Sequence, residues 1–158
     1  MNKYLAGALA GTLATIPMTL TMVALHRLIP KKERKPLPPK QITMEIAEDV
    51  GVSEVLDEEI EQDTVSFINH FAYGAATGAA YAAVAEKVDF PPAALGVGYG
   101  LAVWAGSYLG WLPLAGILPS ATEHPASQNA MMITAHVVWG AALSIILEGI
   151  NKDNEKRH

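Results

Sequence analysis

The chain has 158 residues, the size of one domain, so a second independent globular unit is not expected. Hydrophobic residues make up 51% of it and charged residues only 17%, against about 25% in soluble domains. The net charge of −5 comes mostly from one polar stretch, residues 31–63, and does not indicate that the chain binds nucleic acid. Cysteine is absent, which excludes disulfides, thiolate metal sites and cysteine nucleophiles.

Four long apolar runs dominate the rest of the sequence, at residues 4–25, 65–85, 90–118 and 130–147. Roughly 20 apolar residues in a helix cover a hydrocarbon layer about 30 Å thick, and each run has about this length. A water-soluble helical bundle would instead repeat Lys and Glu every three or four residues along one face of each helix. The runs therefore predict an all-α protein, an integral membrane four-helix bundle that forms a single domain over residues 1–158.

In chain order, helices are expected at residues 4–29, 64–87, 93–112 and 127–149, with a turn at 88–92 and a loop at 113–126. Residues 30–63 form a polar loop that opens basic and turns acidic. Apolar residues at helical spacing after Pro38 and Pro39, and a possible cap at Ser53, predict short helices within this loop. Two interpretations stay open: a surface helical hairpin that covers one mouth of the bundle or recruits a partner, and a solvated connector.

A short pattern occurs twice, at residues 70–78 and 136–144. Each copy has a histidine, two further residues, a large aromatic residue, Gly-Ala-Ala, one residue and then a small one. The copies fall in the second helix of each half of the chain and would cross the membrane in the same direction. This arrangement predicts two helical hairpins related as a parallel repeat about an axis along the membrane normal.

Pairs of small residues four positions apart occur in all four expected helices. In lipid, helices attract one another mainly through close packing of their backbones, which small residues permit. Gly96 and Gly100 form one such pair. Helix packing is also expected at Gly7, Gly11, Gly74, Gly78, Gly106, Gly110, Gly140 and Ser144. Such pairs on every helix favour a tight bundle or a homo-oligomer.

His70 and His136 lie at similar depth in their runs, each at the head of a stripe of small residues, and His124 and Glu123 belong to the same leaflet half. Ionisable groups within a membrane are costly and often functional. A structural role, with each imidazole bonded to a neighbouring helix, competes with three sharper hypotheses. These are haem ligation by the two histidines, a metal site of His70, His136, His124 and Glu123, and a proton-responsive site. Neither haem nor metal is preferred as a cofactor.

Several segments resemble the YagU-like family of small bacterial inner-membrane proteins. They are residues 6–12, Pro17 to Thr19, Leu37-Pro38-Pro39 with Ile42, and His70 with Tyr73, Gly74 and Gly78. The resemblance implies an inner-membrane location. It supplies no catalytic residues, because the function of that family is largely uncharacterised.

The leading hypothesis is a non-enzymatic, multi-pass inner-membrane protein that serves as a packing unit or as a subunit of a membrane complex. Its expected partners are the lipid bilayer and either a second copy or another membrane subunit. The basic loop is expected on the cytoplasmic side, because basic residues concentrate at that end of the first helix. The alternatives are a haem-binding, metal-binding or proton-responsive site at His70 and His136, and a small oligomeric transporter or channel.

Overall fold

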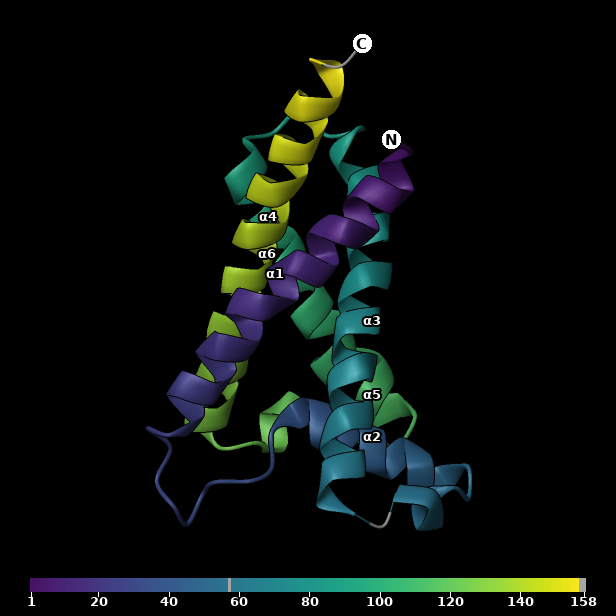
Figure 1. Cartoon of the computed structure of the whole chain (residues 1–158). Coiled ribbons are helices and arrows are strands. Elements are labelled where there is room, and N and C mark those ends of the chain that lie inside the picture. The colour runs from purple at the N-terminus through teal and green to yellow at the C-terminus, as the bar shows by residue number, and fades with distance from the viewer. Residues whose placement is uncertain (57, 157–158) are drawn as a thin grey trace.

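A computed structural model describes residues 1–56 and 58–156, and the secondary structure of these residues consists only of helices (Figure 1). The α-helices are α1 (Lys3–His26), α2 (Pro38–Asp49), α3 (Glu59–Ala85), α4 (Pro92–Ala105), the short α5 (Leu112–Leu114) and α6 (Ala126–Glu155). Short 3-10 helices, η1 (Ser53–Leu56) and η3 (Ala121–Glu123), and a π-helix, η2 (Gly106–Trp111), complete the chain. The prediction of an all-α protein is confirmed.

The helix expected at residues 93–112 is not a single regular helix. The α-helix ends at Ala105 and continues as η2, where the amide of Leu112 bonds the carbonyl of Ser107, five residues back. Gly110 has non-helical angles within this segment, and Pro113 just beyond it has no amide to donate. Glycine and proline both weaken regular helical hydrogen bonding, so the wider π-turn is found where they cluster.

The second and fourth helices are longer than expected, and the polar loop 30–63 contains regular structure. Helix α3 begins at Glu59, five positions before the predicted start at residue 64, with acidic residues in its first turn, where they complement the helix dipole. Helix α6 extends into the charged tail as far as Glu155. Helix α2 begins with prolines in its first turn, a position that proline favours because its missing amide would have no partner there.

The long helices form two hairpins, α1 with α3 and α4 with α6, and α1 also packs against α6. Figure 1 shows α1 crossing the front of the molecule from the upper part of α3 to the lower part of α6. The start of α1 and the end of α6 lie at one end of the molecule, while α2, α5 and the connection between α1 and α2 lie at the other.

Small residues form the close contact within each hairpin. In the first hairpin, a Cβ atom added at Gly11 would overlap the carbonyl oxygen of Gly74, and one at Gly7 would overlap that of Gly78. In the second hairpin, a Cβ at Gly96 would overlap the carbonyl oxygen of Gly140. The two backbones in each hairpin therefore approach so closely that no side chain fits between them.

The remaining small residues divide into two groups. Ser144 lies in the second contact, since its side chain would meet a Cβ at Gly96. Gly106 and Gly110 lie outside these contacts: a Cβ at Gly106 would meet nothing within 4 Å in the described part of the chain, and one at Gly110 only the Ala105 oxygen at 3.9 Å. Gly106 follows Gly100 by six residues, about 240° around a helix of 3.6 residues per turn, so it faces away from the stripe of Gly96 and Gly100.

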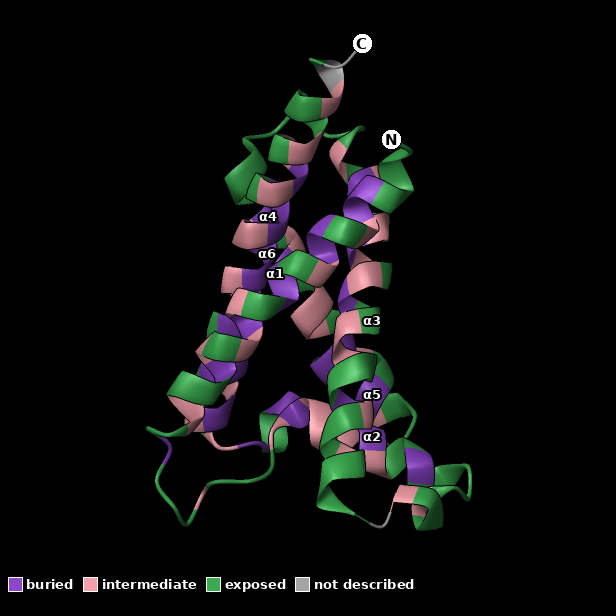
Figure 2. Ribbon diagram, viewed as in Figure 1, coloured by how far each residue is buried: buried purple, intermediate pink, exposed green. Residues whose placement is uncertain are grey.

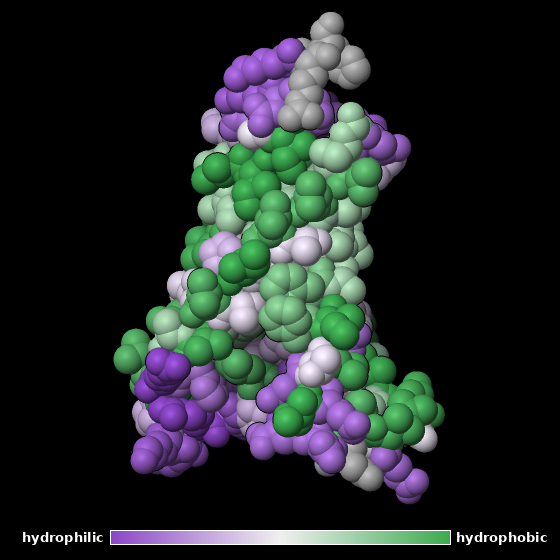
Figure 3. Space-filling model, in the orientation of Figure 1, coloured by the Kyte–Doolittle hydropathy of each residue, from purple (hydrophilic) through white to green (hydrophobic). Residues whose placement is uncertain are grey.

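The core lies where α1 crosses α3 and α6, and Trp139 is its largest fully buried side chain. On α1, alanines and methionines at every fourth position face inward, while leucines on the opposite side remain exposed (Figure 2). Figure 3 shows these exposed apolar side chains as a hydrophobic band between two polar ends. Two helices, Lys3–His26 and Ala126–Asn154, are long and apolar enough to cross a membrane.

Candidate functional site: a cavity headed by two histidines

Below the crossing of the hairpins, the helices diverge and enclose a cavity of about 360 Å³. Its apolar walls include Met18 and Met22 of α1, Ile42 of α2 and Trp111 of η2. Its polar residues come from different elements and include His70 and Tyr73 of α3, Ser107 of η2 and His136 of α6. A mostly apolar cavity of several hundred Å³ with a few convergent polar groups is typical of a small-molecule site.

His70 and His136 both line this cavity, although they come from helices α3 and α6 of different hairpins. They also line a smaller space of about 20 Å³ that reaches further into the core, together with Met18 and Trp139. The crossing of the hairpins thus brings the two histidines of the sequence repeat to one place.

The ring of His136 is held in one orientation. Its Nδ1 lies 2.8 Å from the carbonyl oxygen of Met132, and the ring of Tyr108 packs edge-on at a centroid distance of 6.0 Å. A carbonyl only accepts, so Nδ1 carries the hydrogen and donates it. In the neutral ring the lone pair is then on Nε2, and the one side-chain hydrogen bond of His136 to the described residues is made through Nδ1. His136 therefore offers an acceptor or a metal-ligating nitrogen to a ligand in the cavity.

Two side-chain hydrogen bonds connect the elements around the cavity. The hydroxyl groups of Tyr73 and Ser107 lie 3.1 Å apart and join α3 to η2. The amide of Asn69 donates to the hydroxyl of Thr43 over 3.3 Å and joins α3 to α2. These bonds hold the cavity walls in place from three different elements.

Helix α2 forms one wall of the cavity near the polar end of the molecule. It presents Ile42, Thr43 and Ile46 to the cavity, and the buried Thr43 also accepts the bond from Asn69 of α3. Lys40 adds an ion pair to Asp63 at 2.8 Å. In Figure 3, the molecular surface is hollowed above the polar end, between the lower parts of α1 and α3. Of the two interpretations of residues 30–63, the position of α2 favours a cover over a solvated connector.

The four residues expected to form a metal site do not come together. His70 and His136 share the cavity, but Glu123 and His124 do not line it. Within residues 1–56 and 58–156, no three histidine or acidic side chains lie close enough to hold a metal ion. The depth of a residue in the membrane can be estimated from its position along an apolar run. That depth does not determine on which side of the bundle a loop lies, so it gave no ground for placing Glu123 and His124 beside His70 and His136.

His124 instead lies in a second buried polar group at the start of α6. It is 8% exposed, and within the described residues neither of its ring nitrogens has a hydrogen-bond partner. The neighbouring Gln128 is 3% exposed, and its side-chain oxygen is also unpartnered among those residues. Burial, together with the nearby charge of Lys35, lowers the pKa of His124 below its ordinary value.

Sequence reasoning missed several side chains of the cavity: Met18, Met22, Ser107, Tyr108 and Trp111. Tyr73 belongs to the repeat and to the YagU-like pattern, and neither assigned it to a site. Its counterpart Trp139 has a different environment, since Trp139 is buried in the core and Tyr73 is 42% exposed and lines the cavity. The position of Tyr108 and Trp111 shortly before Pro113 is the one sequence signal for these aromatic residues, and the sequence did not indicate the π-helical turn that contains them.

The fold and site together define an all-α protein in which two helical hairpins with small-residue contacts enclose a cavity headed by two histidines. The chain belongs to the family described as "Protein of unknown function (DUF1440)", whose model matches residues 18–145. The matched range contains α2 and both histidines. No match was found among curated proteins or among solved structures.

Proposed function

We propose that this protein is a multi-pass membrane protein in which α1, α3, α4 with η2, and α6 form a four-helix bundle across the bilayer. The hydrophobic band between two polar ends supports this arrangement, as do the length and composition of α1 and α6 (Figure 3). The YagU-like resemblance and the basic end of α1 favour the inner membrane, with residues 27–35 on the cytoplasmic side.

Within this bundle, we propose a non-enzymatic binding role: the cavity holds a small, largely apolar organic molecule with one polar end. The observation that carries the proposal is the meeting of His70 and His136 in a cavity of about 360 Å³ with mostly apolar walls. The apolar body of the ligand lies against Met18, Met22 and Ile42, and its polar end bonds the imidazoles. The role goes beyond that of a packing subunit, because a bundle that serves only packing has no need of such a space.

Mass spectrometry of the protein purified in mild detergent tests this role. A small molecule should copurify with the natural sequence and be largely lost from the variants His70→Gln and His136→Gln. His26→Gln is the matched control, since His26 bonds the carbonyl of Lys35 and does not line the cavity. Equal retention by all four proteins, or no bound molecule in any of them, would contradict the binding role.

One observation favours a haem or a metal ion as a second candidate ligand. Histidines that ligate metals commonly donate their other ring N–H to a carbonyl, and His136 does so toward Met132. The visible absorption spectrum and elemental analysis of the same preparations distinguish this candidate from an organic ligand. A Soret band or bound metal that disappears in His70→Gln and His136→Gln supports it, and a colourless, metal-free natural protein excludes it.

Self-association is the remaining part of the proposal. Gly106 is exposed, and a Cβ added there would meet nothing within 4 Å among the described residues, so this position has room for the backbone of a second copy. Crosslinking in mild detergent should yield dimers from the natural protein and fewer from Gly106→Leu. Monomers alone from the natural protein would count against self-association.

A further inference from the structure

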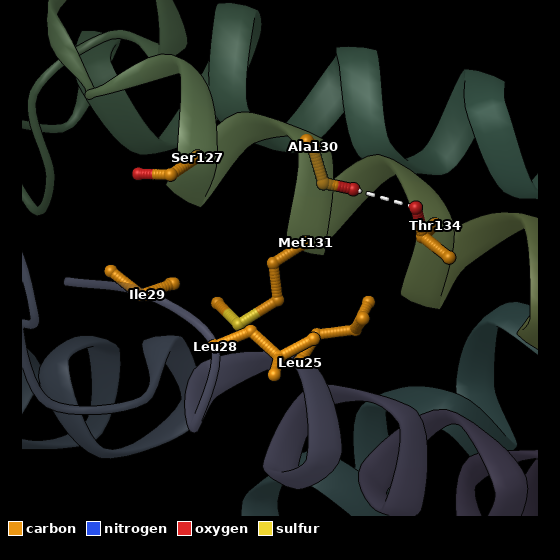
Figure 4. A pocket seen from close by; sticks show the side chains of 7 residues that line it. All are labelled: Leu25, Leu28, Ile29, Ser127, Ala130, Met131 and Thr134. Carbon is orange, nitrogen blue, oxygen red and sulfur yellow. Dashed lines mark hydrogen bonds between the residues drawn. The ribbon is translucent and has the colours of Figure 1, made fainter.

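A second concave surface, separate from the histidine cavity, lies between the end of α1 and the start of α6. It is a groove of about 190 Å³, and Figure 4 shows the side chains that line it. Leu25 and Leu28 come from the α1 side, and Ala130 and Met131 from α6. Leu28 is 78% exposed, so the groove is open along an apolar flank of the molecule.

The two hydroxyl groups of the groove are already bonded. Thr134 donates to the carbonyl oxygen of Ala130 at 2.7 Å, the bond drawn in Figure 4. Ser127 donates to the carboxylate of Glu33 at 3.0 Å. The groove therefore presents hydrocarbon rather than free hydrogen-bonding groups.

The groove ends at the basic segment of residues 27–35. This segment contains five cationic side chains, Arg27, Lys31, Lys32, Arg34 and Lys35, and one acidic residue, Glu33. The guanidinium of Arg34 donates to the carbonyls of Arg27 and Ile29, each at 2.9 Å, and keeps the segment folded against the end of α1. The bond between Glu33 and Ser127 brings the same segment to α6. The cations are thus positioned beside the groove.

Each end of the molecule holds ion pairs, but the cations of residues 27–35 are not among their members. At the end where α1 begins, Lys3 pairs with Glu86 and Lys152 with Glu148. At the other end, the ion pairs between described side chains include none of the five cations of residues 27–35. Lys31 and Lys32 are also exposed. Their positive charge is available to an anion from outside the chain.

We propose that the groove holds one acyl chain of an anionic phospholipid, whose phosphate lies among Arg27, Lys31 and Lys32. Clusters of basic residues at the cytoplasmic end of a transmembrane helix attract anionic lipids, and here an apolar groove continues from the cluster. The lipid seals the exposed seam between α1 and α6. The inference rests on the proposed insertion of the protein in a bilayer.

Native mass spectrometry tests the inference on the full chain, purified in detergent and given equal amounts of phosphatidylglycerol and phosphatidylcholine with the same acyl chains. The natural protein should retain phosphatidylglycerol preferentially. The double variant Lys31→Gln/Lys32→Gln should reduce this preference about tenfold, because two of the cations are lost. The matched control, Lys87→Gln/Lys156→Gln, removes the same charge at the other end and should leave the preference unchanged.

A second pair of variants tests the groove itself. Ala130→Phe fills the groove and should lower phosphatidylglycerol retention while the basic segment is intact. Ile145→Phe, at an exposed position of α6 away from the groove, is its control. Free glycerol phosphate should not displace the lipid, because it has no chain for the groove; displacement would indicate a simple phosphate site and overturn the inference.

The outcomes separate this inference from the proposed function. Equal retention of the two lipids by a protein that reconstitutes into bilayers overturns the lipid site alone. Equal effects of the two double variants overturn it as well. A protein that remains soluble in buffer without detergent and does not enter vesicles overturns the membrane proposal, and the lipid site with it.

Discussion

The indole N–H of Trp139 on α6 donates to the carbonyl oxygen of Gly11 on α1, over 3.3 Å. The backbone of Gly11 also touches Gly74 on α3, so this one turn of α1 contacts both α3 and α6. The hydrogen bond therefore joins the two hairpins at the crossing above the histidine cavity.

Trp139→Phe should lower the free energy of unfolding by about 1 kcal/mol, because it removes the bond to Gly11 and keeps most of the buried ring. Trp139→Ala should cost about 3–5 kcal/mol, since it also leaves a large cavity. Thermal unfolding in detergent measures both. Trp111→Phe is the control, because Trp111 is 42% exposed and makes no such bond among the described residues. A Trp139→Phe protein as stable as the control would contradict the role of this bond.

Gly11→Ala and Gly96→Ala should each destabilise the protein by about 1–3 kcal/mol, because the added methyl group overlaps the carbonyl oxygen of Gly74 or Gly140. Gly98, two residues after Gly96, lies on another face of α4, where an added Cβ meets nothing within 4 Å among the described residues. Gly98→Ala should be neutral or stabilising, since alanine has the higher helix propensity. Melting temperatures of the three variants provide the comparison. Similar losses at Gly98 and Gly96 would show that the hairpin contact is not the cause.

The stability of the protein should fall on acidification, in part because of His124. Its folded pKa lies below the ordinary value, so between the two values the unfolded chain binds more protons than the folded one. The contribution is complete above the ordinary histidine pKa and is lost as the pH falls through this window. Melting temperatures at about pH 7.5 and about pH 5.5 should differ less in His124→Gln than in the natural protein. An equal loss in both would contradict the assignment to His124.

Lys40→Glu should loosen α2 from α3, because it replaces the ion pair with Asp63 by repulsion. The natural chain has no cysteine, so a single Thr43→Cys substitution reports on the buried side of α2. Maleimide should label this cysteine several times faster when Lys40→Glu is also present. Lys31→Glu makes the same change of charge outside this contact and should leave the rate unchanged. Equal labelling in both backgrounds would show that α2 is held by other contacts.

The two histidines show how much of the site could be predicted from the sequence. The repeat at residues 70–78 and 136–144 predicted similar depths for His70 and His136, and the structure places both on one cavity. The prediction for Glu123 and His124 failed, because depth alone does not place a loop around the axis of a bundle. Ser107 and Trp111 were not anticipated, because a regular helix was expected over residues 93–112 instead of the π-helical turn at residues 106–111.

The all-α class, the approximate positions of the long helices and the small residues that let backbones meet could all be predicted from local pattern, because apolar run length, proline and glycine act within one or two turns of the chain. The path of α1 from α3 to α6, the divergence of the hairpins below Trp139 and the place of α2 as a wall of the opening could not be predicted in this way. These features depend on contacts between residues far apart in the chain, which many sequences with the same local pattern would make differently.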